Sequence, residues 1–180
     1  MAAMMKNRAD NGVPSTLMKV YYTQRADDCG FLITECMAVS KQGNCYSKNG
    51  NCYTIEQVIK WKDISDSVHS VNGLIFGQVY HCGRDNINKG IGPSPIRNRQ
   101  DSSFPVPKEM SLEDILHVRD QFRTSSRLLL NYSGMDGIEI HAANSYLIDL
   151  FLRDYTNNRT NKYGGSIENR CSSYWKSSMT

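Results

Sequence analysis

Three short apolar runs constrain the fold of this chain more than any other feature of its sequence. Each is rich in Ile, Val or Phe and is followed by polar residues, as is typical of a buried strand. The runs are Phe31–Val39, Gly73–Tyr80 and Gly137–His141. Every gap between them exceeds the roughly a dozen residues of a parallel crossover, so the pattern predicts a parallel α/β sheet. The opening residues, Met1–Met5, are a candidate for one further strand.

Four other segments carry helical signals, either apolar side chains at helical spacing or capping residues. They are residues 14–25, 54–68, 111–130 and 146–152. In the second segment Thr54 and Gln57 have the spacing of a capping box, and in the third Ser111 is an N-cap candidate. Residues 85–108 form the longest irregular stretch and hold four of the five prolines. We expect a surface loop over a site there.

Composition and motif spacing argue against several classes of protein. The 21 Lys and Arg nearly balance the 18 Asp and Glu, so we expect no nucleic-acid partner. No apolar run reaches the roughly 18 residues of a membrane span, and Met1–Asp10 lacks a signal-peptide pattern. We therefore expect a cytoplasmic protein with no membrane partner. The six cysteines show no C-x-x-C spacing, so we expect no metal site and free thiols, with a disulfide such as Cys45–Cys52 as the alternative.

Polar side chains stand at the ends of the predicted strands, where parallel α/β folds place their active sites. They are Glu35 and Cys36 in the first run, Gln78 and His81 at the end of the second, and His141, Asn144 and Tyr146 after the third. His141 and Asn144 can both donate hydrogen bonds to one carbonyl oxygen and so stabilise an enolate. Tyr146 is a candidate proton donor to the neighbouring carbon. From spacing alone, the alternative is that His141 caps a strand and Tyr146 packs in the core.

Longer blocks around these residues resemble the old yellow enzyme family of flavin oxidoreductases, which includes the 12-oxophytodienoate reductases. The blocks occur in the family's order and with family-like spacing. They are Asn7-Arg-Ala-Asp10, Tyr21-Tyr-Thr-Gln-Arg-Ala26, Phe31-Leu-Ile-Thr-Glu35, Gln78-Val-Tyr-His-Cys-Gly-Arg84, Gly137-Ile-Glu-Ile-His-Ala-Ala-Asn-Ser-Tyr-Leu-Ile-Asp149 and Asn158-Arg-Thr-Asn-Lys-Tyr-Gly-Gly-Ser-Ile-Glu-Asn-Arg170.

The resemblance implies a (β/α)8 TIM barrel with FMN at its C-terminal face. Hydride passes from NAD(P)H through the flavin to the activated C=C bond of an enone or related electrophilic alkene. In this family pattern His141 and Asn144 bind the substrate's carbonyl oxygen, and Tyr146 donates the proton. Gln78 matches the residue whose amide bonds the flavin's pyrimidine edge, since an amide both donates and accepts. The flavin contacts that the resemblance implies are the backbone near Ala3, Met4 and Met5, together with Cys36, Gln78 and His141.

Five positions depart from the family pattern. Ala3 replaces the usual Pro, and Met5 replaces Thr. Cys36 stands where the family has Ala or Gly, Tyr80 replaces Trp, and Ser145 replaces Gly. The change at Met5 would alter the tuning of the flavin, because the usual Thr hydroxyl bonds the reactive side of the ring and Met has no such donor.

The resemblance covers residues 1–170, about the first four strand–helix units of the barrel, and leaves 171–180 as a divergent tail. The unmatched half normally carries an arginine near the flavin and its phosphate-binding loops, so we expect weak FMN binding. A truncated FMN-dependent ene-reductase is the first interpretation. The alternatives are a catalytically inactive fragment and a binding or assembly module. Open barrel edges lead us to expect a homodimer or aggregation.

Overall fold

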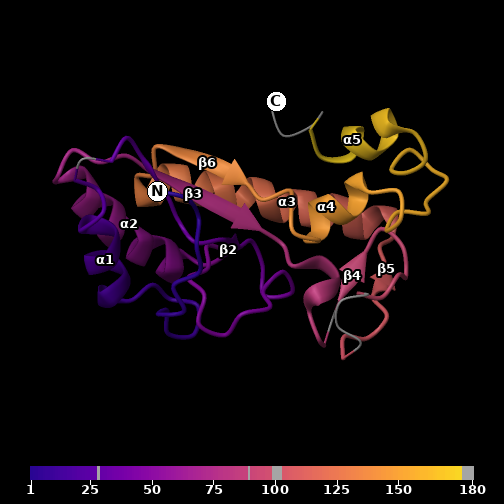
Figure 1. Cartoon of the computed structure of the whole chain (residues 1–180), viewed down its shortest axis with the longest axis horizontal. Helices are drawn as coiled ribbons and strands as arrows, with labels where there is room; N and C mark the ends of the chain where they lie inside the picture. Colours follow the sequence, from indigo (N-terminus) through magenta and orange to yellow (C-terminus); the bar gives the residue numbers. More distant parts are fainter. Residues whose placement is uncertain (28, 89, 99–102, 176–180) are drawn as a thin grey trace.

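The computed structural model describes residues 1–27, 29–88, 90–98 and 103–175 (Figure 1). Its helices are α1 (Thr16–Thr23), α2 (Ile55–His69), α3 (Leu112–Leu128), α4 (Leu147–Leu152) and α5 (Ile167–Trp175). Its strands are β1 (Leu32–Ile33), β2 (Met37–Ala38), β3 (Ile75–Tyr80), β4 (Ile91–Gly92), β5 (Lys108–Glu109) and β6 (Gly137–Ile140). A 3-10 turn, Gly83–Asp85, follows β3, and a π-helical turn, Leu129–Ser133, extends α3.

The main sheet is parallel and has β3 at its centre. β1 and β2 both pair with one edge of β3, and β6 pairs with the other. Across the β3–β6 pair Gln78 lies opposite Glu139. The predicted parallel α/β sheet is therefore confirmed, and it is open, because among the described residues no further strand pairs with the outer edges of β1, β2 or β6.

The first apolar run forms two short strands instead of one continuous strand. At the break the Thr34 side-chain oxygen accepts the Gln78 backbone N–H at 3.0 Å, and the Glu35 N–H donates to the Tyr22 hydroxyl at 2.8 Å. Side chains thus take over bonds that a regular ladder would make between backbones. The Glu35 carboxylate is also buried, and it accepts backbone N–H groups from Lys6 and Gly50.

The segment Met1–Met5 lies beside β1 but is not a strand, contrary to the sequence-based expectation. Its carbonyl at Met1 accepts the Ile33 N–H at 2.9 Å. The chain then turns to the Glu35 carboxylate through the Lys6 N–H. The Glu35 carboxylate thus binds the Lys6 N–H at the point where a strand would have continued to pair with β1.

Two of the predicted helices begin at the residues that their sequences indicate. Thr54 and Gln57 close a capping box at the start of α2, and Ser111 and Asp114 close another at the start of α3. The short helix expected over 146–152 is α4, with Tyr146 as its N-cap residue. α5 was not predicted, and it crosses the proposed boundary at 170/171, while residues 176–180 lie outside the described part of the chain.

The described residues of the segment 85–108 include regular structure that its composition does not predict, while residues 89 and 99–102 lie outside the described part of the chain. The segment contains β4, which pairs in parallel with β5 at its far end. Arg159 holds the segment from the side, because its Nη1 donates to Pro93 O and to Met110 O, both at 2.8 Å. This region packs with α4 and α5 at the end of the molecule opposite α1 and α2 (Figure 1).

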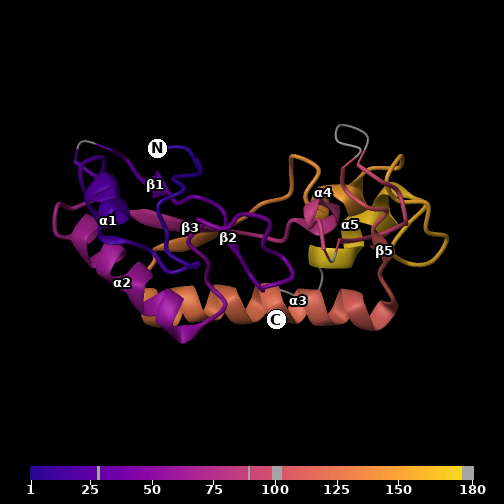
Figure 2. The same ribbon diagram turned by 90° about the horizontal axis from the view of Figure 1, so that it is seen from below.

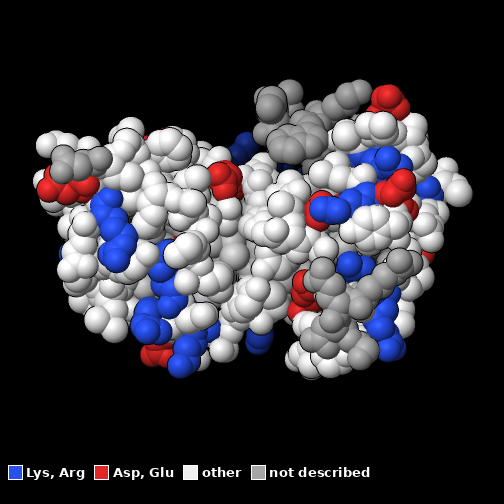
Figure 3. Space-filling model, in the orientation of Figure 1, with Lys and Arg blue, Asp and Glu red and all other residues white. Residues whose placement is uncertain are grey.

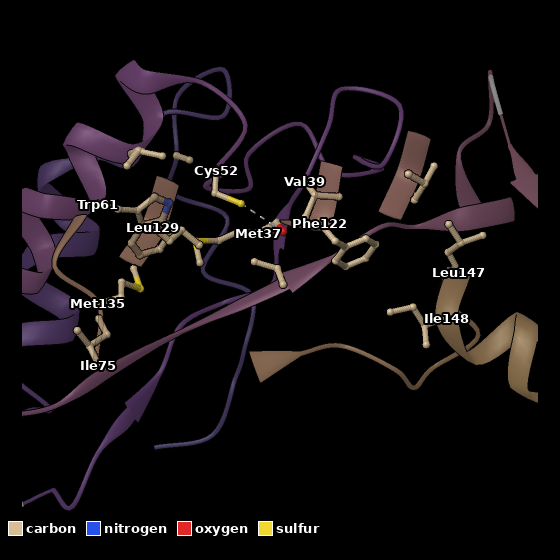
Figure 4. Close-up of a cluster of buried hydrophobic side chains, with 14 of the residues drawn as sticks. Met37, Val39, Cys52, Trp61, Ile75, Phe122, Leu129, Met135, Leu147 and Ile148 are labelled. Atoms are coloured by element: carbon tan, nitrogen blue, oxygen red, sulfur yellow. Dashed lines mark hydrogen bonds between the residues drawn. The ribbon is translucent and has the colours of Figure 1, made fainter. Parts of the chain in front are cut away.

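The main core lies between β3 and the helices on one face of the sheet (Figures 2 and 4). Ile75 and Val79 of β3 join Trp61 of α2 and Phe122 of α3 there. Gly77 lies between them on the same face, and a Cβ atom at this position would lie 2.8 Å from Met37 Cε. Since side chains alternate along a strand, Phe76, Gln78 and Tyr80 face the opposite side of the sheet.

Charges on the face shown in Figure 3 form small separate groups toward the two ends, and the middle of that face is largely uncharged. In the part of the chain that the structure describes, no helix combines the length and the apolar character that crossing a membrane requires.

Candidate functional site

The face of the sheet opposite the main core carries a second cluster at the C-terminal ends of β2 and β3. Its buried members are Cys36, Ala38, Tyr80, Cys82 and Tyr146, and Met5, Cys45 and Tyr53 pack against them. These residues come from five separate stretches of sequence. Because the strands are parallel, their carboxyl ends meet at one edge and bring these stretches together.

His141 follows β6 and lies over this cluster, with its ring 4.8 Å from the Tyr146 ring in an edge-to-face contact. Its Nδ1 accepts the Ala143 backbone N–H at 3.3 Å. Burial lowers the pKa of His141, against the opposing effect of the Glu139 and Asp149 carboxylates. The ring is therefore neutral at pH 7 and carries its proton on Nε2, which makes that nitrogen a hydrogen-bond donor.

Tyr146 is buried between aromatic rings and shares its hydroxyl with a second tyrosine. Its ring lies 5.0 Å from that of Tyr80, and its oxygen lies 2.8 Å from the Tyr46 oxygen, where either hydroxyl can donate. Burial raises the pKa of Tyr146 well above its usual value, and the bond with Tyr46 raises it further. Tyr146 is thus a protonated phenol at neutral pH.

Asn144 is placed differently from its predicted partners. It is exposed, and no hydrogen bond within the described residues involves its side chain. Asn144 and Ser145 have φ values of 57° and 61°, in the left-handed region. Asn adopts this conformation more readily than Ser does, so the family's usual Gly would relieve strain at Ser145. The Ser145 N–H donates to Asp149 at 2.8 Å and stabilises the turn.

Gln78 is nearly buried on the same face and donates through Nε2 to the Glu139 carboxylate. No hydrogen bond within the described residues reaches its Oε1, which leaves an amide acceptor available. Glu139 was not among the predicted site residues. The sequence does contain a sign of Glu139, which is a carboxylate between two isoleucines of a predicted strand. A carboxylate that is partly buried in a sheet needs a polar partner.

The N-terminal residues predicted to contact a flavin have different environments. Met5 is half-buried, and its sulfur lies 3.5 Å from the Cys36 thiol. Ala3 is also half-buried, whereas 62% of Met4 is exposed. The structure therefore brings Met5 and Cys36 into the cluster and leaves the Met4 side chain outside it.

Tyr46 is the other residue that the sequence did not single out. It lies in the loop between β2 and α2, 100 positions before its hydrogen-bond partner Tyr146. No local motif marks it, because only the meeting of distant loops brings the two hydroxyls together.

Comparison with known proteins gives a consistent result over nearly the whole chain. Residues 1–175 match the model of the NADH:flavin oxidoreductase / NADH oxidase family. The chain is 39% identical to a putative 12-oxophytodienoate reductase 3 of Oryza sativa subsp. japonica, over 95% of this chain and 47% of the relative. It is 35% identical to 12-oxophytodienoate reductase 2 of Arabidopsis thaliana, over 95% of this chain and 50% of the relative.

Solved structures with a similar fold also match nearly the whole chain. The old yellow enzyme homologue of Zymomonas mobilis has a TM-score of 0.88 and 34% identity, over 96% of this chain and 52% of that one. Morphinone reductase in complex with tetrahydroNAD has a TM-score of 0.90 and 28% identity, over 96% of this chain and 53% of that one. The chain spans about half the length of the curated relatives that it matches.

Proposed function

The chain belongs to the NADH:flavin oxidoreductase / NADH oxidase family, that of the old yellow enzymes and 12-oxophytodienoate reductases, and its fold is the N-terminal part of a TIM barrel. From that premise we propose that its site serves FMN-dependent reduction of the activated C=C bond of an α,β-unsaturated carbonyl compound, with NAD(P)H as reductant. The observation that carries the proposal is the contact between His141, a neutral Nε2–H donor, and Tyr146, a protonated phenol.

The described residues fit the flavin in part. The open Oε1 of Gln78 accepts a hydrogen bond, and the remaining amide hydrogen donates one, which suits the donors and acceptors of a pyrimidine edge. Cys36 and Met5 offer an apolar sulfur surface beside it. Met5 brings no hydroxyl donor to the flavin's reactive side, so we expect a flavin tuned differently from the family norm. FMN, when bound, supplies the transfer of reducing equivalents from NAD(P)H to the alkene.

The protein's own residues bind and polarise the substrate in this proposal. His141 Nε2–H donates to the carbonyl oxygen, where negative charge develops, and Asn144 joins it when its loop side chain turns inward. Tyr146 gives its hydroxyl proton to the carbon next to the carbonyl. Tyr46 holds the Tyr146 oxygen in place through the 2.8 Å contact and can donate to it as the proton leaves.

The first test mixes the purified 180-residue chain with FMN and follows the flavin absorption band after desalting. A retained, shifted band that weakens in Gln78→Ala supports the proposal. Complete loss of flavin from a folded chain contradicts activity of this chain by itself.

The second test uses Tyr146→Phe with NADPH and an enone. Loss of a general acid typically costs roughly 100- to 10,000-fold in rate. We expect that drop in alkene reduction, with flavin reduction by NADPH unchanged. Tyr132→Phe is the matched control, because Tyr132 is 58% exposed and lies outside the cluster. Equal alkene reduction by Tyr146→Phe and the unsubstituted chain would remove Tyr146 from the mechanism.

A second candidate function, an assembly module, is favoured by one specific observation. Among the described residues the outer edge of β6 has no strand partner, whereas Met1 bonds to the outer edge of β1 and Cys52 to that of β2. A strand edge without a partner pairs readily with another chain. In this role the chain would pair with a full-length relative or with a second copy of itself, and its site residues would carry out no catalysis.

A further inference from the structure

Two thiols from distant parts of the sequence meet at the C-terminal end of β3. Cys82 follows β3, and Cys45 lies in the loop between β2 and α2. The Cys82 backbone N–H donates to Gly43 O at 2.9 Å, which holds the loop against the end of the strand. The Cys82 thiol also donates to Gln42 O at 3.7 Å, and Cys45 packs against the cluster that contains Cys82. Both thiols are free.

Contacts at Cys45 and at the residues just before it hold the loop that carries this cysteine. Asn86 Nδ2 donates to the carbonyl oxygens of Gln42 and Asn44, at 2.9 and 3.2 Å. The Tyr80 hydroxyl donates to Asn44 Oδ1 at 3.3 Å and lies 3.9 Å from the Cys45 sulfur. A disulfide requires its two cysteines to be close, and these contacts keep the Cys45 loop against the end of β3.

The two thiols differ in pKa and in exposure, as the attacking and resolving cysteines of a reactive pair do. The neighbouring Cys82 thiol lowers the pKa of Cys45, against the opposing effect of burial, and the Cys45 thiol together with burial raises the pKa of Cys82. Cys45 is half-buried, whereas Cys82 is fully buried. Because the thiolate is the nucleophile and needs access to the oxidant, Cys45 is the attacking sulfur and Cys82 the resolving one.

Neither of the other buried thiols combines these properties. Burial raises the pKa of Cys36 to about 12, and its thiol points to the Met5 sulfur. Burial also raises the pKa of Cys52, whose thiol donates to Ala38 O at 3.3 Å. The Cys45–Cys52 disulfide left open by the sequence is not formed, and the prediction of free thiols is confirmed for all six cysteines.

We propose that Cys45 and Cys82 form a redox-modification site at which a hydroperoxide converts the two thiols into a reversible disulfide. The Cys45 thiolate attacks one peroxide oxygen, the O–O bond breaks, and the leaving hydroxide (or alkoxide) takes a proton. Cys45 is then a sulfenic acid. The Cys82 sulfur attacks the Cys45 sulfur, the S–O bond breaks, and the departing hydroxide takes the Cys82 proton as water. Two thiols lose two electrons and two protons, and the peroxide is reduced.

The disulfide links the Cys45 loop covalently to the end of β3. Tyr46 follows Cys45 directly, and its hydroxyl contacts Tyr146 at 2.8 Å. Oxidation thus restrains the loop that positions the Tyr46–Tyr146 pair. This step needs no bound flavin, so it stands independently of the proposed activity.

The test treats the full chain, as Cys171→Ser, with stoichiometric hydrogen peroxide. The substitution removes an exposed thiol that would cross-link two molecules. We expect titratable thiols to fall from five (six cysteines less Cys171) to three, and peptide mass mapping to find Cys45 linked to Cys82. Dithiothreitol restores all five. Retention of all five thiols, or a bridge from Cys45 to Cys36, would overturn the proposal.

Matched variants separate the two roles. In Cys82→Ser the Cys45 sulfenic acid accumulates and is labelled by dimedone, whereas in Cys45→Ser residue Cys82 is not labelled. Cys29→Ser, which changes a half-buried thiol outside the pair, leaves bridge formation unchanged. Equal dimedone labelling of Cys82 and Cys45 in the two single variants would contradict the assignment of the attacking sulfur. The peptide map requires no substitution at either cysteine, so it decides the proposal even if a variant folds poorly.

Discussion

At the scale of single residues, His81 shows how burial at the end of a strand controls ionisation. The ring is 1% exposed, and its Nδ1 accepts the Gly83 backbone N–H at 3.1 Å. Its Nε2 is buried and has no hydrogen-bond partner among the described residues. Burial lowers the pKa of His81 from its ordinary value of 6.5 to about 3. The folded protein therefore holds this histidine neutral.

Because of this lowered pKa, we expect the free energy of unfolding to decrease in acid as a result of the buried His81. A group whose pKa is depressed by folding contributes stability above its unfolded pKa and loses it as the pH falls toward its folded pKa. Between about pH 6 and 4 we expect the free energy of unfolding to fall by about 1.4 kcal/mol per pH unit from this residue. Urea unfolding at several pH values measures the slope, and His81→Asn should flatten it. His141 is present in both proteins, so the difference isolates His81. Parallel curves for the two proteins would rule out this role.

At the scale of elements, features that depend on neighbouring residues were predicted from the sequence, whereas features that depend on distant residues were not. The capping box of α2 and the Ser111 cap of α3 form as predicted, because their donors and acceptors lie within one helical turn. The break between β1 and β2 was not predicted, because it depends on Tyr22 and on bonds to β3. The β4–β5 pair was missed for the same reason, since each strand is two residues long and is stabilised by its partner and by Arg159.

The α2 cap gives a test at this scale. Thr54 Oγ1 accepts the Gln57 N–H, so Thr54→Ala leaves that donor unpaired and should lower the free energy of unfolding by about 1 kcal/mol. Thermal or urea unfolding followed by circular dichroism measures the change. Ser15→Ala is the matched control, because Ser15 is the N-cap residue of α1 but makes no side-chain cap bond. A loss in Ser15→Ala as large as that in Thr54→Ala would show that the cap bond is not the cause.

At the scale of the whole molecule, one face of the sheet is covered by helices, and the other carries Phe31 and Phe76 as well as the site. These rings lie 5.3 Å apart, and Phe31 is 49% exposed. Gly137 of β6 leaves room for the Phe76 ring, because a Cβ atom at this position would lie 2.3 Å from that ring. Exposed aromatic surface favours association, and so does the outer edge of β6, which has no strand partner among the described residues.

We therefore expect the chain to self-associate as its concentration rises. Phe31→Ser removes apolar surface from the open face and should shift the equilibrium toward monomer in sedimentation velocity experiments. Leu17→Ser is the control, because Leu17 is 66% exposed on α1, a helix that packs against α2. A monodisperse monomer at every concentration of the unsubstituted chain would contradict association through the open face.

The sequence by itself determined the parallel α/β class, the family and the strand ends that carry Gln78, His141 and Tyr146. These follow from apolar periodicity and from motifs contained in single stretches of chain. Only the tertiary structure decided that Tyr46 reaches Tyr146, that Glu139 binds Gln78 and that the Cys45 loop lies against Cys82. Each of these pairs joins residues far apart in sequence, and their contact depends on parallel strands that bring distant loops to one edge of the sheet.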